Sequence, residues 1–274
     1  MVVISNAELF AAKPEIVFPL DDSRLAELSQ MKDLAIGEMA GRDSVAAILA
    51  ALESDDVGAV LPVAVYTATE YGDWPGFERN AKFLRRAARE RFGKPVLDLV
   101  WMGSPQLWRA LNGRYITDIV RRFGAYSPCL ACHFYLHAVR IPLAVQLGAR
   151  VVIGGDRERH DDRSKINQLP PVVDAYQRLF RRFGLELREP LRAVTDTTGL
   201  ETVLGPTWPG GSPQPACLFS GNYYPLDGAQ GWTEAGVMAF VDGFVYPVLE
   251  RVVAAQVGSR PVDYLQVAAE VLSS

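Results

Sequence analysis

Hydrophobic and polar positions follow two alternating patterns along the chain. Runs rich in Val, Ile and Leu indicate buried strands at residues 34–36, 59–68, 96–101, 150–153 and 186–194. Segments with apolar residues at helical spacing predict helices at residues 45–52, 76–92, 106–123, 130–147 and 172–183. Strands that alternate with helices are typical of a parallel sheet covered by helices on both faces. The pattern therefore predicts an α/β fold with about five parallel strands.

The two ends of the chain depart from this alternation. Short strands are predicted at residues 2–4 and 16–18, and a short helix at 22–30 with Asp21 or Asp22 as its cap. Residues 205–231, rich in Gly, Pro and Ser, predict a long loop, and helices follow at 233–255 and 261–272. We therefore expect an N-terminal extension (1–30), a Rossmann-like domain (31–195), and a cysteine-bearing loop with C-terminal helices (196–274).

Composition narrows the class of protein. Of the 274 residues, 49% are hydrophobic, which is enough for one large domain with its own core. The sequence shows neither a membrane-spanning run of about 20 apolar residues nor a basic leader followed by an apolar stretch. These features predict a cytoplasmic protein without membrane contact. The net charge of −4 argues against an extensive nucleic-acid-binding surface.

The chain has three cysteines, Cys129, Cys132 and Cys217. An odd number without an export signal argues against a disulfide framework. A Cys-x-x-Cys pair at the start of a helix can hold a metal or a cluster, and the helix N-terminus is expected to lower the thiol pKa. Three cysteines suit a [4Fe-4S] cluster with one open iron. Zinc with His133 or His137 as the fourth ligand and a redox-active Cys129–Cys132 pair are alternatives.

A turn of small residues follows the first predicted sheet strand, and a helix begins within it. Its residues are Ala40, Gly41, Arg42, Asp43 and Ser44. Such a turn lets a phosphate approach the free N–H groups of the helix. The Ser44 hydroxyl is placed to donate to phosphate, and Asp43 to cap the helix or orient a magnesium ion. An ordinary strand-to-helix turn capped by Asp43 is the alternative.

This turn resembles the PP-loop, Ser-Gly-Gly-x-Asp-Ser, of the adenine-nucleotide α-hydrolase-like superfamily. The match is at Gly41, Asp43 and Ser44, whereas Met39 and Ala40 stand where the family has Ser and Gly. The order of PP-loop, Cys-x-x-Cys helix and late cysteine is similar to that of the iron–sulfur-dependent tRNA thiolation enzymes of this superfamily. The resemblance extends over residues 34–217.

A second match lies after the fourth sheet strand. Gly154 and Gly155 are followed by His160, Asp161 and Asp162, which resemble the family's Gly-His-His/Asn-x-Asp-Asp turn with residues 156–159 inserted. The resemblance implies that Asp161 or Asp162, beside His160, binds magnesium or orients an adenylated substrate. Lys165 follows closely and is a candidate for phosphate contact. Without the resemblance, residues 156–165 are equally well explained as a solvated charged loop.

The resemblance implies an ATP-dependent sulfurtransferase. ATP with Mg²⁺ would activate a substrate carbonyl by adenylation, and sulfur would replace the oxygen with the help of a [4Fe-4S] cluster on the three cysteines. The implied partners are a sulfur donor (sulfide or a carrier protein), an acceptor that is either tRNA or a small molecule, and a second copy of the chain in a homodimer. An arginine-rich helix is either a solvated face or an RNA-binding stripe; its arginines are Arg85, Arg86, Arg89 and Arg91.

Two other functions fit the same residues. One is an enzyme of the same fold that acts on a small molecule, including an iron–sulfur desulfidase that removes sulfur. The other is a cluster- or zinc-binding sensor with a degenerate nucleotide site, an interpretation that rests on Met39 and Ala40.

Overall fold

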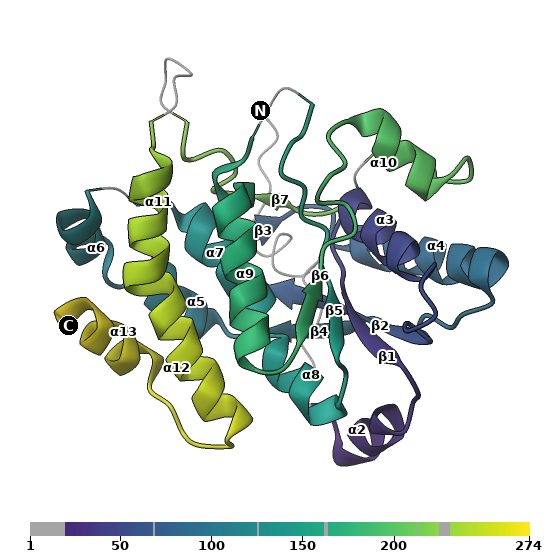
Figure 1. Cartoon of the computed structure of the whole chain (residues 1–274), viewed down its shortest axis with the longest axis horizontal. Coiled ribbons are helices and arrows are strands. Elements are labelled where there is room, and N and C mark those ends of the chain that lie inside the picture. Colours follow the sequence, from purple (N-terminus) through teal and green to yellow (C-terminus); the bar gives the residue numbers. More distant parts are fainter. Residues whose placement is uncertain (1–19, 68, 125, 162–163, 212, 225–230) are drawn as a thin grey trace.

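The computed structural model describes residues 20–67, 69–124, 126–161, 164–211, 213–224 and 231–274. It shows a central sheet with helices on both sides (Figure 1). The short strands predicted at residues 2–4 and 16–18 lie outside the described residues. The first described helix, α2 (Asp22–Ser29), begins as predicted after Asp21, whose side chain accepts a hydrogen bond from the Arg24 amide.

Five parallel strands form the sheet, in the order β4-β2-β1-β5-β6. They are β1 (Leu34–Glu38), β2 (Ala59–Tyr66), β4 (Val100–Gly103), β5 (Val151–Ile153) and β6 (Glu186–Arg188). Leu34 pairs with Ala59 on one side of β1, and Ile36 pairs with Val152 on the other. The predicted α/β class with five parallel strands is confirmed. The strand order changes direction at β1, and in such sheets ligands bind beyond the carboxyl ends of the strands at this point.

Each face of the sheet carries its own apolar core. Along β2, Leu61 and Val63 point into one core while Val60 and Ala64 point into the other, as the two-residue repeat of a strand requires. One face is covered by α3 (Arg42–Ala51), α4 (Pro75–Phe92) and α10 (Thr197–Leu204). The other is covered by α7 (Pro128–Ala138), α8 (Ile141–Leu147), α9 (Pro170–Arg182) and α12 (Tyr246–Val257) (Figure 1). Because β2 is buried on both faces, its sequence is almost continuously apolar.

Two of the predicted helices are each divided into two. Residues 106–123 form α5 (Pro105–Asn112) and α6 (Ile116–Phe123), separated at Gly113. Residues 130–147 form α7 and α8, because Pro142 has no backbone N–H to continue the hydrogen-bond ladder of α7. Both breaks leave the helices packed on the same core.

The α7–α8 stretch bears on the expectation that the chain has no membrane-spanning run. Pro128–Leu147 is 20 residues long with a mean hydropathy of 1.2, so by length and composition it could cross a membrane. In the structure 67% of this window is buried inside the protein. The stretch is apolar because it lies in the core, between the sheet and the C-terminal helices.

The C-terminal part packs closely against the sheet domain. The predicted helix at 233–255 is α11 (Glu234–Phe240), a π-helical turn η2 (Val241–Val245) and α12, and α13 (Tyr264–Ser273) closes the chain. The loop before them contains β7 (Ala216–Cys217), which pairs antiparallel with β3 (Glu70–Tyr71). This short pairing, which the sequence did not reveal, fixes the position of Cys217.

Candidate functional site

A cavity of about 400 Å³ lies at the carboxyl ends of the strands. Its wall includes the start of α3, the turn after β5 and one side of α7. Gln214 and Pro215 line it as well, directly before Cys217. The cavity therefore extends from the predicted phosphate-binding turn to the neighbourhood of the cysteines.

The start of α3 forms one wall of this cavity. Gly41 is its N-cap and no side chain caps the helix, so the alternative in which Asp43 is the cap is wrong. The Asp43 carboxylate instead accepts a hydrogen bond from Arg157 Nε at 3.1 Å. Among the described residues, no side chain accepts a hydrogen bond from the first N–H groups of α3, which therefore suit an anion.

Gly155 allows the turn after β5 to approach α3. A Cβ atom at this position would lie 3.0 Å from Ser44 N and 3.1 Å from the Asp43 carbonyl carbon. Both are backbone atoms, which cannot move aside as a flexible side chain can. The two loops that flank the cavity are thus in contact because residue 155 is glycine.

The cavity also contains positive charge. Lys165 and Arg42 line it together with Ser44. Within the described part of the chain Lys165 forms no ion pair, while Arg42 Nε lies 3.4 Å from Asp43 Oδ1. Burial lowers the pKa of Lys165, and the neighbouring Asp43 acts against this shift. A partly buried lysine beside a free helix N-terminus favours the binding of a phosphate group.

Beneath the cavity lies a buried network centred on His137 of α7. His137 Nδ1 is 2.6 Å from Glu38 Oε1 at the end of β1, and Nε2 is 2.9 Å from Asp156 Oδ2 after β5. Burial favours the neutral ring, but the two carboxylates outweigh it and raise the pKa of His137 to about 10. Both ring nitrogens therefore donate at neutral pH. Arg140 lies 3.2 Å from the same oxygen of Glu38.

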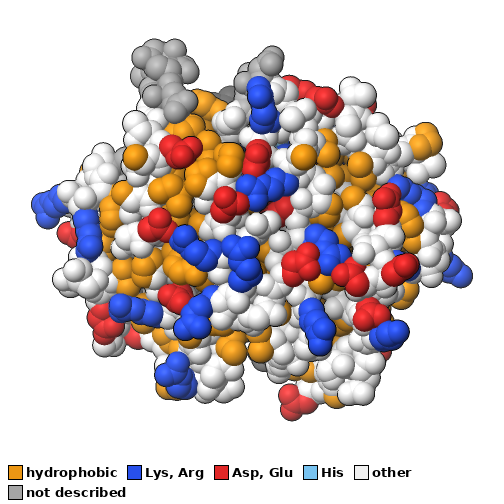
Figure 2. All heavy atoms as spheres, in the orientation of Figure 1, with side chains coloured by type: hydrophobic (Ala, Val, Ile, Leu, Met, Phe, Trp, Pro, Cys, Tyr) orange, Lys and Arg blue, Asp and Glu red, His pale blue; other side chains and the backbone are white. Residues whose placement is uncertain are grey.

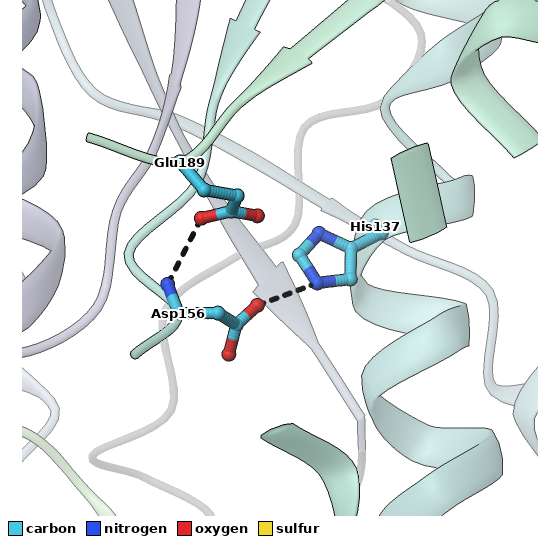
Figure 3. A group of neighbouring side chains, drawn as sticks. All are labelled: His137, Asp156 and Glu189. Atoms are coloured by element: carbon cyan, nitrogen blue, oxygen red, sulfur yellow. Dashed lines mark hydrogen bonds and ion pairs between the residues drawn. The ribbon is translucent and has the colours of Figure 1, made fainter. Parts of the chain in front are cut away.

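Glu189, which follows β6, completes this group (Figure 3). Its Oε2 accepts a hydrogen bond from the Asp156 amide at 3.0 Å. Its Oε1 is buried and has no hydrogen-bond partner among the described residues. Burial, and then the charge of Asp156, raises the pKa of Glu189 well above its usual range. Gly154 makes room for this carboxyl group, which a side chain at residue 154 would overlap.

A chain of hydrogen bonds connects the His137 network to the predicted phosphate-binding turn, where Arg157 binds Asp43. Arg157 donates to His160 Nδ1 at 2.8 Å, and His160 Nε2 bonds to Gln168 Oε1. Gln168 Nε2 in turn donates to Asp156 Oδ1 at 2.5 Å. Burial lowers the pKa of His160, which suits a neutral ring that accepts at Nδ1 and donates at Nε2.

The predicted catalytic loop is placed only in part. His160 and Lys165 line the cavity. Asp161 instead accepts hydrogen bonds from the backbone amide and the hydroxyl of Thr197, at 3.2 and 3.3 Å, and so connects the loop to the start of α10. Asp162 lies outside the described residues. A catalytic role for Asp161 or Asp162 stays a prediction.

The three cysteines come from two elements that lie side by side. Cys129 and Cys132 occupy the first turns of α7, and Cys217 lies on β7 opposite Glu70 of β3. Trp108 Nε1 donates to Cys132 Sγ at 3.2 Å, and Cys129 Sγ is 3.2 Å from Asn222 Oδ1. All three are free thiols.

The expected lowering of the thiol pKa at the start of α7 is wrong. Burial raises the pKa of Cys129 to about 11 and shifts that of Cys132 further in the same direction, because it disfavours the thiolate more than the helix N-terminus favours it. The charge of Cys217 raises the pKa of both thiols further.

The three thiols are not spaced to hold a single ion. Among the described residues, their sulfur atoms do not form a group in which all lie within 4.8 Å of one another, as ligands of one ion would. In the zinc alternative, His137 would also have to give up Glu38 or Asp156, which contact its two ring nitrogens. His133 lines the cavity, where burial lowers its pKa to about 4.

Two arginines of the arginine-rich helix α4 bind neighbouring loops. Arg85 donates to the Val96 and Leu97 carbonyls and pairs with Asp98, and Arg91 donates to the Val203 carbonyl. These two side chains stabilise neighbouring loops. On the face shown in Figure 2, positive and negative side chains are interspersed. Neither observation favours an RNA-binding stripe.

No protein-family model matches the chain. It is 37% identical over 234 residues to the uncharacterized protein MJ0009 of Methanocaldococcus jannaschii, and the alignment covers 84% of each chain. The chain belongs to the MJ0009 family. Membership of the MJ0009 family brings no activity with it, because the name of this archaeal relative states none. The function must therefore be argued from the site.

Proposed function

We propose that the protein is an ATP-dependent sulfurtransferase that activates a substrate carbonyl by adenylation and replaces its oxygen with sulfur. The observation that carries this proposal is the cavity that extends from the start of α3 to Gln214, Pro215 and Glu70, which neighbour Cys217 in the sequence or across the β3–β7 pairing. Such a cavity allows a nucleotide and a sulfur source to reach the same substrate atom.

The residues at the α3 end suit binding of the triphosphate of Mg²⁺-ATP. The free N–H groups of α3, the Ser44 hydroxyl and the Lys165 ammonium would hold the phosphate oxygens. The substrate oxygen would attack the α-phosphorus, and pyrophosphate would leave with the bond electrons. The oxygen then remains on AMP as a good leaving group. The chain's contribution is mainly position and charge.

The residues at the other end suit a [4Fe-4S] cluster held by Cys129, Cys132 and Cys217. When bound, such a cluster supplies an open iron that can present sulfur to the activated carbon. Glu70 lies between the cavity and the thiols, and burial raises the pKa of its carboxyl group. Because the raised pKa favours the neutral acid, Glu70 is placed to give a proton to the departing oxygen.

The cavity favours a small-molecule acceptor. Its volume of about 400 Å³ is in the range of small-molecule sites. On the face drawn in Figure 2 positive and negative side chains are interspersed, and the net charge is −4; neither feature favours tRNA, which binds basic surfaces. Binding of tRNA that weakens steeply with salt would reverse this preference.

The test is to purify the full chain without oxygen, measure iron and sulfide, and follow pyrophosphate release from ATP while candidate acceptors are supplied. We expect about four irons per chain, loss of iron in Cys217→Ala, and weaker ATP binding with unchanged iron in Lys165→Met. Full iron content in Cys217→Ala, or sulfur transfer without pyrophosphate release, contradicts the proposal.

A second candidate is a small-molecule enzyme of the same fold that does not consume ATP, such as an iron–sulfur desulfidase. It is favoured by Glu38 and Met39, which line the cavity where a polyphosphate would need donors. Iron in the protein together with sulfide release from a thiolated compound, without pyrophosphate, supports this second candidate.

A further inference from the structure

We propose that His137, Asp156 and Glu189 bind one divalent transition-metal ion at the floor of the cavity. One ligand atom from each lies within 4.8 Å of the others, and among the described residues no other three His, Cys, Asp or Glu side chains do so. The three side chains come from α7, the end of β5 and the end of β6 and converge on one point (Figure 3).

The carboxyl group of Glu189 gives an independent reason to expect a ligand. The residue is 9% exposed, and its Oε1 is buried with no partner in the described structure. Leaving such a buried polar atom unsatisfied is energetically unfavourable. Figure 3 shows Oε2 bonded to the Asp156 amide and the other oxygen on the side of the imidazole. An ion between these groups supplies the missing partner.

The surrounding side chains already hold the ligands in place. If the ion takes Nε2 of His137, then Nδ1 still donates to Glu38 at 2.6 Å. A carboxylate behind a metal-bound histidine is a recurrent arrangement that fixes the ring. Gln168 holds the other oxygen of Asp156 at 2.5 Å, and Arg140 holds Glu38. Each of these contacts exists before an ion binds.

The charge of the group also favours a cation. The carboxylates of Glu38 and Asp156 both contact His137, and Glu189 lies beside Asp156, whereas Arg140 pairs with Glu38 alone. A divalent ion between His137, Asp156 and Glu189 would offset this concentration of negative charge.

One imidazole and two carboxylates suit Mn²⁺, Fe²⁺ or Zn²⁺. This donor set contains no sulfur, so the site is separate from the cysteines. His137 and Asp156 line the cavity, which gives an ion a path from solvent. This inference does not depend on the proposed sulfur transfer.

The experiment is a titration of the full-length, chelator-treated protein with Mn²⁺ in the absence of nucleotide, followed by electron paramagnetic resonance. We use Mn²⁺ because it prefers nitrogen and oxygen donors to thiolates. We expect one ion per chain, with magnetic coupling to one histidine nitrogen. Glu189→Gln should weaken binding by about 100-fold, and Glu38→Gln by about 10–100-fold because it acts behind the ligand.

The matched control is Glu201→Gln, which makes the same change at an exposed position of α10 and should leave Mn²⁺ binding unchanged. Circular dichroism checks that each variant is folded. The nitrogen coupling is measured on the unaltered protein, so the test stands even if a variant does not fold. Absence of Mn²⁺ binding, absence of histidine coupling, or wild-type binding by a folded Glu189→Gln overturns the inference. Iron content and pyrophosphate release report separately on the proposed function.

Discussion

Two groups of side chains next to the cavity, the His137 network (the histidine end) and the three cysteines (the cysteine end), are organised by different forces. At the histidine end, His137 is fixed by two carboxylates at 2.6 and 2.9 Å. At the cysteine end, the thiols make longer contacts of 3.2–3.5 Å with uncharged groups, and burial keeps Cys129 and Cys132 protonated. The first end is ordered by its own charges. At the second end, the proposed cluster would have to supply the remaining order. Four predictions test this difference.

The largest effect is expected for Glu38→Ala at the histidine end. The substitution leaves His137 and Arg140 buried without the carboxylate that faces both. Breaking a buried ion pair in this way costs about 3–5 kcal/mol of unfolding free energy. Urea denaturation measures the loss, and Glu201→Ala at the surface is the control, with an expected change below about 0.5 kcal/mol. A loss as small as that of the control would mean that the network contributes little.

A pH titration tests the same network without a mutation. The folded-state pKa of His137 is raised from 6.5 to about 10, so its contribution to stability is complete below pH 6.5 and is lost as the pH rises through about 10. The raised pKa of Glu189 acts in the same direction. We expect the Tm to fall by at least about 4 °C between neutral pH and a pH above the raised pKa of His137.

Imidazole NMR provides the matching site-specific measurement. The chain has three histidines. At pH 7 one ring should be charged, that of His137, while the rings of His133 and His160 are neutral because burial lowers the pKa of both. Three neutral rings at pH 7 would contradict the assignment.

A smaller loss of stability is expected for Gly155→Ala. This substitution would push the turn after β5 away from the start of α3, where phosphate binding is predicted. The new methyl group would meet backbone atoms of Asp43 and Ser44 at 3.0–3.1 Å. Such overpacking costs about 1–3 kcal/mol, and ATP binding should weaken because α3 is displaced. Gly199→Ala is the control, since its nearest neighbour at 3.1 Å is a side-chain atom of Val194. Calorimetric titration measures the ATP affinity of both variants. Equal affinities would contradict the expectation that the contact between Gly155 and α3 supports ATP binding.

The smallest effect on stability is expected for Cys217→Ser in metal-free protein. Among the described residues its thiol makes weak contacts with Thr69 and the Phe219 amide, at 3.5 and 3.4 Å, which a hydroxyl can replace. The unfolding free energy should change by less than about 0.5 kcal/mol, although binding of the proposed cluster is expected to be lost. A loss comparable to that of Glu38→Ala would show that the cysteine end is also ordered without a metal.

Most of the fold could be predicted from the sequence, because its signals are local. The buried strand β2 is visible as an apolar run, and α4 as a long amphipathic pattern. The divisions between α5 and α6 and between α7 and α8 were missed, since helical spacing continues across Gly113 and Pro142. The helix α10 was missed because Thr197–Leu204 is short and weakly patterned.

The site was less predictable than the fold, since it depends on residues far apart in the sequence. The phosphate-binding turn and the cysteines were found as motifs. Asp156 was seen only as part of an insertion beside a motif, Glu189 as part of the predicted strand at 186–194, and His137 was not placed in a network. One signal was present: Glu38, Asp156 and Glu189 all stand at or just after the ends of buried strands. Which of these ends become neighbours follows from the strand order, which no local pattern specifies.

That strand order also has a consequence for how the chain folds. β1 pairs with β2 across a short stretch of chain, but Ile36 meets its other partner, Val152, only after more than a hundred intervening residues. Contacts so distant in sequence form late, because a long loop must close first. On the ribosome, the half that carries Glu38 and the α3 turn emerges with one edge of β1 uncovered. The histidine network can therefore assemble only after β5 has paired with that edge of β1 and β6 has paired with β5.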